Sequence, residues 1–157
     1  MTQVTPKALM QKALRQIFVP AIRAAGFEGR LPHFSRMRDT KRQMLMVMFN
    51  KYGGSFYVEA GSMTENAVHE LQGHWLTSGK ELTEAMLTVG HCPWQCRARL
   101  GGSNVSPDTD HWYTFGPGRL EEPNPACHPY EHYLALAQSA TIATLVQAEE
   151  FFQRASP

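Results

Sequence analysis

The sequence contains few cysteines, almost no net charge and no long run of apolar residues. Its 157 residues include 3 cysteines, and the formal net charge at pH 7 is +1. A small, odd number of cysteines does not support a disulfide framework and fits reduced thiols in the cytoplasm. A net charge near zero provides no general attraction to nucleic acid or to anionic membranes. The composition therefore argues against a disulfide-rich secreted scaffold and against a strongly basic nucleic-acid binder.

Patterns of membrane insertion and of export are also missing. No stretch approaches the roughly 20 consecutive apolar residues that a membrane span needs, and the first residues lack the apolar core and cleavage site of a signal peptide. We therefore expect a cytoplasmic protein without membrane association. Hydrophobic residues make up 43% and charged residues 18% of the chain, as is typical of globular proteins. At this length we expect a single domain over residues 1–157.

The most informative stretch is a predicted β-hairpin with strands at residues 42–50 and 55–61. The first strand contains the unbroken apolar run 44–49, which is typical of a central strand buried on both faces. Gly53 and Gly54 favour the turn, because glycine adopts positive φ angles without a Cβ clash. The second strand alternates, and one of its faces carries the apolar side chains of Phe56, Val58 and Ala60.

Helices are predicted at both ends of the sequence. Apolar residues recur every three or four positions over residues 6–25, after a capping Thr5 and before Gly26, which is typical of a helix end. Pro20 predicts a kink or a break in this helix. A second helix is predicted over residues 130–154. Its apolar side chains, which we expect to face the core, include Leu134, Ala137, Ile142, Leu145, Val146 and Phe152.

Three further strands are predicted at residues 32–38, 95–100 and 111–115. Short helices are predicted near residues 64–75 and 79–88, because each range has the pattern of a capping box at or just before its start. Strands grouped in sequence between terminal helices indicate an α+β fold, with an antiparallel β-sheet of about five strands packed against the N- and C-terminal helices.

The hairpin resembles a known bacterial family. Residues 50–58, NKYGGSFYV, are similar to the centre of the bacterial domain-of-unknown-function family numbered 4304. Members also have a leading helix that ends in a glycine-phenylalanine pair, here residues 26–27, and then a strand with an aromatic residue, here Phe34. A later strand contains cysteine and arginine, as residues 96–100 do here.

This resemblance covers roughly residues 6–115 and implies a fold plan and a bacterial source, but no activity and no functional residues. Some small bacterial domains of this kind lie beside toxin genes. By analogy at the level of the fold, the resemblance suggests an immunity-like protein that neutralises a toxin.

Catalytic motifs are incomplete. His69 and His74 flank Glu70 but are five residues apart, whereas a helical zinc-protease motif needs histidines four residues apart to reach one ion. The glycine-serine pairs at 54–55 and 102–103 lack the second glycine of a nucleophile elbow. We therefore predict no catalytic residues, and the sequence favours a non-catalytic binding or interaction module over an enzyme.

Histidines and cysteines leave a metal site open as an alternative. Thiolates and imidazoles suit Zn²⁺, which would indicate a metal-dependent enzyme or a zinc-stabilised domain. However, Cys96 is predicted to share a strand face with Ala98 and Leu100, which favours ordinary core packing and no cofactor. The candidate ligands of this alternative are His91, Cys92, Cys96, Cys127, His128 and His132.

Arginine and aromatic side chains gather on the predicted strands. A sheet face of this composition has three alternative roles. It binds an acidic protein partner, or it binds single-stranded nucleic acid. In the third, it is a solvated face whose charges protect strand edges. The near-neutral net charge favours the solvated face over nucleic acid. Arg36 and Arg38 share a face with the core residue Phe34, so we expect a bulge or an edge position there. If a partner binds, the predicted contacts are Arg36, Arg38, Arg42, Tyr57, Glu59, Arg97 and Arg99.

Overall fold

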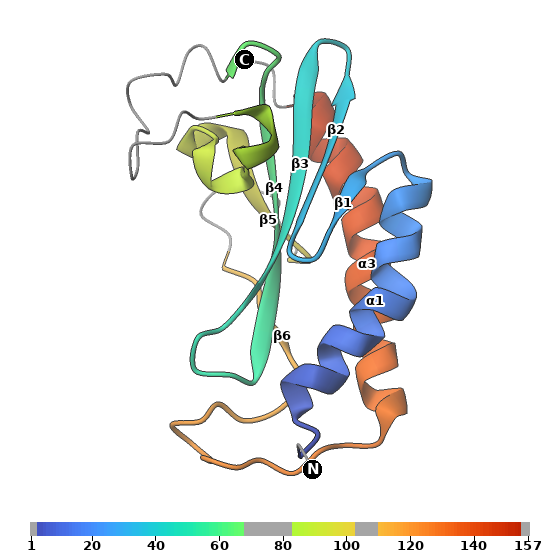
Figure 1. The fold of residues 1–157 in the computed structure, drawn as a ribbon, viewed down its shortest axis with the longest axis vertical. Coiled ribbons are helices and arrows are strands. Elements are labelled where there is room, and N and C mark those ends of the chain that lie inside the picture. Colours follow the sequence, from blue (N-terminus) through green and yellow to red (C-terminus); the bar gives the residue numbers. More distant parts are fainter. Residues whose placement is uncertain (1–2, 68–82, 103–109, 155–157) are drawn as a thin grey trace.

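The fold is an antiparallel β-sheet with two long helices packed along one of its faces (Figure 1). The computed structural model describes residues 3–67, 83–102 and 110–154. Three short 3₁₀ helices lie between the fourth and fifth strands. The elements in chain order are α1 (Pro6–Ala24), β1 (Glu28–Arg30), β2 (His33–Arg38), β3 (Lys41–Phe49), β4 (Ser55–Thr64), η1 (Glu84–Met86), η2 (Val89–His91), η3 (Trp94–Cys96), β5 (Arg97–Leu100), β6 (Tyr113–Thr114) and α3 (Tyr130–Arg154).

The first helix begins as its sequence predicts. The side chain of Thr5 accepts a hydrogen bond from the backbone N–H of Ala8 at 3.2 Å, and proline occupies the first helical position. The helix continues through Pro20 without a break. Phe18 and Ile22, on either side of this proline, are fully buried, and their packing holds the two halves in one element.

The sheet is built around the predicted hairpin. Its strand order is β1-β2-β3-β4-β5, all neighbours are antiparallel, and β6 pairs with the first residues of β4. Strand β3 occupies the centre, and residues 43–47 on both of its faces are buried. The prediction of a central strand followed by a strand with one apolar face is therefore confirmed.

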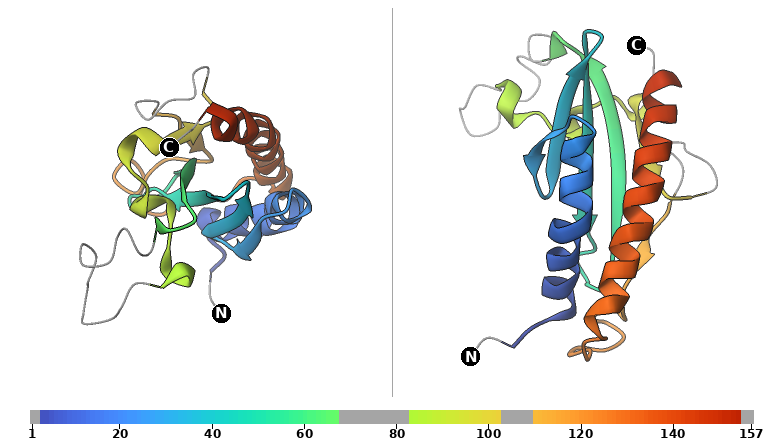
Figure 2. Two further views of the ribbon diagram at one scale, coloured as in Figure 1. Left: turned by 90° about the horizontal axis from the view of Figure 1, so that it is seen from above. Right: turned by 90° about the vertical axis from the view of Figure 1, so that its right-hand side faces the viewer.

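One face of the sheet forms the main core with the two helices. Paired residues on four adjacent strands, Phe34, Leu45, Ala60 and Ala98, form a continuous buried row on this face. Helices α1 and α3 lie side by side over it (Figure 2). The predicted α+β fold, with its sheet packed against the terminal helices, is confirmed.

The predicted core residues of α3 are confirmed in part. Ala137 and Phe152 are buried, whereas Ile142, Leu145 and Val146 are exposed. Much of the buried face carries small residues, which allow the backbone of α3 to pack close to α1. These small residues are Ala137, Ala140, Thr141, Thr144 and Ala148.

The opposite face of the sheet carries a second, smaller core. Segment 83–96, which contains η1, η2 and η3, covers the upper part of this face (Figure 1). Met44 and Met46 of the central strand pack there instead of under the helices. The buried members of this core are Met44, Met46, Met63, Ala67, Leu87, Val89 and Cys92.

The two predicted short helices are confirmed only in part where they can be compared with the structure. Ala67, the last described residue before the gap at 68–82, is helical. Ser62 and Thr64 belong to β4, because pairing with β3 satisfies their backbone and overrides the capping pattern. Of residues 83–88, only Glu84–Met86 forms a helical turn, and it is 3₁₀. The rest of the ranges 64–75 and 79–88 lies largely outside the described residues.

Strand β5 starts two residues later than predicted. Cys96 is the last residue of η3, so it does not share the buried face of Ala98 and Leu100, and its predicted core position is wrong. Strand β6 is also shorter than the predicted range 111–115. None of the helices within the described residues is long and apolar enough to cross a bilayer.

A buried arginine connects both helices to the sheet. The side chain of Arg36 is 5% exposed and donates hydrogen bonds to the side chains of Gln43 and Glu149 and to the carbonyl of Ala25. Its guanidinium lies 4.3 Å from the centre of the Phe27 ring. Because these groups come from β3, α3 and the segment after α1, Arg36 holds the layers of the fold together.

Glu149 compensates the charge of this arginine. Burial raises the pKa of Glu149, but the hydrogen bonds and charges of Arg36 and Arg38 outweigh that effect and bring its pKa below the ordinary value. Glu149 is therefore ionised at neutral pH and forms an ion pair with both arginines.

Candidate functional site

The seven predicted contact residues lie on two opposite faces of the sheet. Arg36 and Arg38 share the face of Phe34 and approach α3, whereas the other five lie on the opposite face. The register of β2 with β3 is continuous from residue 33 to 38, so there is no bulge. A single binding face that includes Arg36 is therefore wrong, because strict alternation directs Arg36 into the core. The five residues on the opposite face are Arg42, Tyr57, Glu59, Arg97 and Arg99.

The centre of this second face is an arginine that contacts two aromatic rings. The guanidinium carbon of Arg99 lies 3.8 Å from the ring centre of Tyr57 and 5.1 Å from that of Trp112. The two rings meet edge to face, with centres 4.9 Å apart. Asp110 accepts hydrogen bonds from Arg99 and, at 2.9 Å, from the indole nitrogen of Trp112. The side chains are therefore ordered before any partner arrives.

A second arginine extends the face toward η3. Arg97 donates to Glu59 at 2.6 Å, and this hydrogen bond raises the pKa of Arg97. Glu59 is buried, with a side chain 6% exposed, so it positions Arg97 from below and does not offer its carboxylate to solvent. The guanidinium carbon of Arg97 lies 5.9 Å from the ring of Trp94, which is 59% exposed.

On the other side, Met48 completes a continuous surface. It pairs with Tyr57 across β3 and β4 and is 38% exposed. The six side chains span β3, β4, η3, β5 and the residue before β6. We name them the aromatic–arginine surface: Met48, Tyr57, Trp94, Arg97, Arg99 and Trp112.

Three arginines of this face are neutralised. Each forms an ion pair with a carboxylate, and the pairs are Arg42 with Glu84, Arg97 with Glu59, and Arg99 with Asp110. These three pairs contain equal numbers of positive and negative side chains, so they add no net charge to the face that was predicted to be basic. Its chemical character comes from aromatic rings and methionine together with paired guanidinium groups.

A comparison with protein-family models assigns the family. The model of a domain of unknown function, DUF4304, matches residues 18–121, which is more than half of the 157-residue chain. The chain belongs to the DUF4304 family. The resemblance seen in the hairpin is thus confirmed. No curated protein and no solved structure matches this DUF4304 chain.

The aromatic–arginine surface lies entirely within the region matched by DUF4304. Three of its members, Met48, Trp94 and Trp112, were not predicted from the sequence. Met48 belongs to an apolar run that indicated burial on both faces. Trp94 lies just before the predicted strand 95–100, and Trp112 lies within the predicted strand 111–115, which was not assigned to a binding face. Only the pairing of β6 with β4, which places Trp112 beside Tyr57, identifies that residue.

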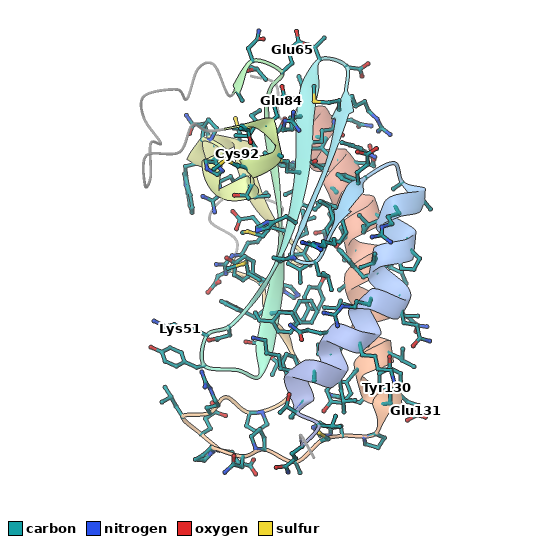
Figure 3. All side chains as sticks on the ribbon, in the orientation of Figure 1. Lys51, Glu65, Glu84, Cys92, Tyr130 and Glu131 are labelled. Carbon is teal, nitrogen blue, oxygen red and sulfur yellow. The ribbon has the colours of Figure 1, made fainter. Side chains whose placement is uncertain are left out.

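The predicted metal ligands of the DUF4304 chain fall into two groups at opposite ends of the molecule. His91 and Cys96 end η2 and η3, and Cys92 lies between these two helices, whereas Cys127, His128 and His132 lie near the start of α3. Figure 3 labels Cys92 near the upper end and Tyr130 near the lower end. Within residues 3–67, 83–102 and 110–154, no three histidine, cysteine or acidic side chains are placed to bind a metal ion. The motif His69–Glu70–His74 lies outside the described residues.

The contacts within each group indicate that these residues contribute to packing of the fold. Cys92 is buried against Gly61, where an added Cβ would lie 2.6 Å from its sulfur. At the other end, the His128 and His132 rings lie 4.3 Å apart, and Cys127 donates to the carbonyl of residue 4 at 3.4 Å. Burial raises the pKa of the Cys92 thiol to about 12, so it is not an activated nucleophile.

We expect Cys92 to react with a thiol reagent much more slowly than Cys127. At about pH 8 a thiol whose pKa is about 12 has a thiolate fraction on the order of 10³-fold below that of an ordinary cysteine. Reaction of Ellman's reagent with a variant that keeps only Cys92, and with one that keeps only Cys127, measures the difference. Unfolding in concentrated urea should abolish this difference in reaction rate, because both thiols are then exposed. Equal native rates would contradict the burial of Cys92.

Proposed function

We propose that this DUF4304 protein is a non-catalytic module that binds another protein through the aromatic–arginine surface. The observation that carries the proposal is the cluster of Arg99, Tyr57 and Trp112, in which the guanidinium contacts both rings and the two rings contact each other. Tryptophan, tyrosine, methionine and arginine are the residues enriched at the centres of protein interfaces, where they supply most of the binding energy.

Pre-organisation of the surface supports the proposal. Asp110 fixes both Arg99 and Trp112, and Glu59 fixes Arg97 from a buried position. Side chains that are already ordered lose little conformational entropy on binding, so more of the contact energy is available for affinity. Exposed Met48 and Trp94 add apolar area at two sides of this ordered centre.

The expected partner presents apolar side chains surrounded by carbonyl or carboxylate oxygens. Apolar groups would cover Met48 and Trp94, and oxygens would meet the N–H groups of Arg99 that its contact with Asp110 does not use. Single-stranded nucleic acid is a weaker candidate, because the paired arginines leave little net positive charge to attract phosphates. Toxin neutralisation stays one specific case of protein binding, which a neighbouring toxin gene would support.

We expect alanine at Trp112 or Trp94 to weaken the complex by about 30-fold or more, the effect of losing an aromatic hot spot. The protein and its variants are purified from the organism that naturally contains the protein, so that a stoichiometric partner is isolated with it. That partner is then produced separately. Calorimetry with the two purified proteins gives the dissociation constants. The control is Leu120→Ala, because Leu120 is 80% exposed and lies outside the surface.

Two outcomes would count against protein binding at this surface. In one, a purified partner binds Trp112→Ala and Trp94→Ala as tightly as the wild type, although all variants have unchanged melting temperatures. In the other, the wild type binds a thymidine oligonucleotide in a salt-dependent way and both tryptophan variants lose that binding. That second result would assign the surface to nucleic acid.

A further inference from the structure

A cavity of about 380 Å³ lies at the end of the molecule where three distant segments meet. These segments are the turn of the β3–β4 hairpin, the start of α1 and the connection over residues 115–125, all at the lower end of Figure 1. Its volume falls in the range of roughly 300–1,000 Å³ that small-molecule sites occupy. None of its lining residues belongs to the aromatic–arginine surface.

The backbone of this region is held in place by close contacts. Gly54 has a φ angle of +82°, and a Cβ added to it would lie 2.6 Å from the carbonyl oxygen of Gly116. The carbonyl of Gly54 accepts a hydrogen bond from Phe115 at 2.8 Å, and that of Tyr52 accepts one from Arg119 at 2.6 Å. The walls are therefore preformed. Prolines stiffen other parts of the lining, at Pro6, Pro117, Pro123 and Pro125.

The charged side chains that line the cavity are all cationic. Lys7, Lys51 and Arg119 line it, and no aspartate or glutamate does. Among the described residues none of these three cations forms an ion pair with a carboxylate, unlike the arginines on the sheet. The Lys7 and Lys51 ammonium groups lie 5.5 Å and 4.8 Å from aromatic rings, and Arg119 donates to a backbone carbonyl. Three cations that line one cavity and form no ion pair among the described residues favour a positive potential there.

We propose that this cavity binds a small organic anion, a carboxylate or a phosphate ester attached to an apolar body. The anionic group is attracted by Lys7, Lys51 and Arg119, and the apolar body packs on the proline rings and Phe115. Lys7 also lies in the first turn of α1, where the helix dipole adds to the attraction. The proposal is independent of protein binding at the aromatic–arginine surface.

Two aromatic probes test the proposal and distinguish the two anion types. Phenyl phosphate and benzoate are titrated separately into ¹⁵N-labelled protein at low salt, with benzyl alcohol as the neutral control. We expect at least one of the two anions to cause saturable shifts of the amides of Gly53, Gly54 and Arg119, and to bind more weakly as salt increases. The alcohol should cause none. The tighter anion identifies the preferred class.

Substitution of the cations completes the test. We expect Lys51→Gln with Arg119→Gln to weaken binding of the phosphate or carboxylate probe by about tenfold or more, because charge-assisted contacts are lost. Lys7→Gln provides a second variant that removes no hydrogen bond described above. Arg15→Gln, an exposed position on α1 outside the cavity, should bind like the wild type.

The proposal is overturned if neither anion reaches saturation by a concentration on the order of 10 mM. It is also overturned if folded Lys7→Gln and the double variant bind as the wild type does, or if the shifts map to other parts of the sheet. Loss of protein binding at the aromatic–arginine surface would leave it unaffected.

Discussion

Replacing Arg36 with alanine is expected to lower the free energy of unfolding by about 3–5 kcal/mol, because a large buried side chain and its hydrogen bonds are lost together. The substitution leaves Gln43 and the carbonyl of Ala25 without their shared donor and removes the positive charge that holds Glu149. It also opens space beside the rings of Phe27 and Phe152. Urea unfolding at neutral pH measures the change.

Arg38 provides the matched control, because it contacts the same carboxylate from a more exposed position. Its side chain is 47% exposed and that of Glu149 is 39% exposed, so solvent screens this ion pair. We expect Arg38→Ala to change the free energy of unfolding by less than about 1 kcal/mol. If the two alanine variants are equally stable, Arg36 does not hold the helices to the sheet.

Replacing Gly54 with alanine is expected to destabilise the protein by about 2–4 kcal/mol, the sum of backbone strain and a steric clash. Its φ angle of +82° disfavours any residue with a Cβ, and the new Cβ would meet the carbonyl of Gly116 at 2.6 Å and Pro117 at 2.8 Å. Neither contact belongs to a flexible side chain, so the hairpin turn and the 115–125 connection must separate.

Gly116→Ala is the control for this substitution. A Cβ at Gly116 would have no atom within 4 Å, and its φ angle lies outside the left-handed range. We expect a change within about 0.5 kcal/mol. Thermal and urea unfolding of both variants measure the difference. A Gly54→Ala protein as stable as Gly116→Ala would show that the hairpin does not pack closely on the connection.

Local signals in the sequence were sufficient to predict the main elements. The cap at Thr5, the glycine pair at the turn and the alternation of residues 55–60 each depend on neighbours a few positions away, and the structure confirms all three. The core face of the middle of α3 could not be predicted in this way. Ile142, Leu145 and Val146 indicated the wrong face, because close approach to α1 selects alanine and threonine there.

The candidate site depended on contacts between distant residues, which the sequence pattern does not reveal. Arg36 was predicted to face outward because it is charged, but Glu149, 113 residues later, makes its burial possible. Arg97 and Arg99 were placed on the correct face by alternation alone. Their carboxylate partner Asp110 and the ring of Trp112 come from a different segment, so a basic face was predicted where a neutralised, aromatic one exists.

Hydrogen exchange on the purified complex tests most directly whether the aromatic–arginine surface is the binding site. We expect the partner to slow exchange in peptides that contain Met48, Tyr57 and Trp112, and to leave exchange in α3 unchanged. A stable complex whose protection is confined to α3, where Ile142 and Val146 are exposed, would contradict it.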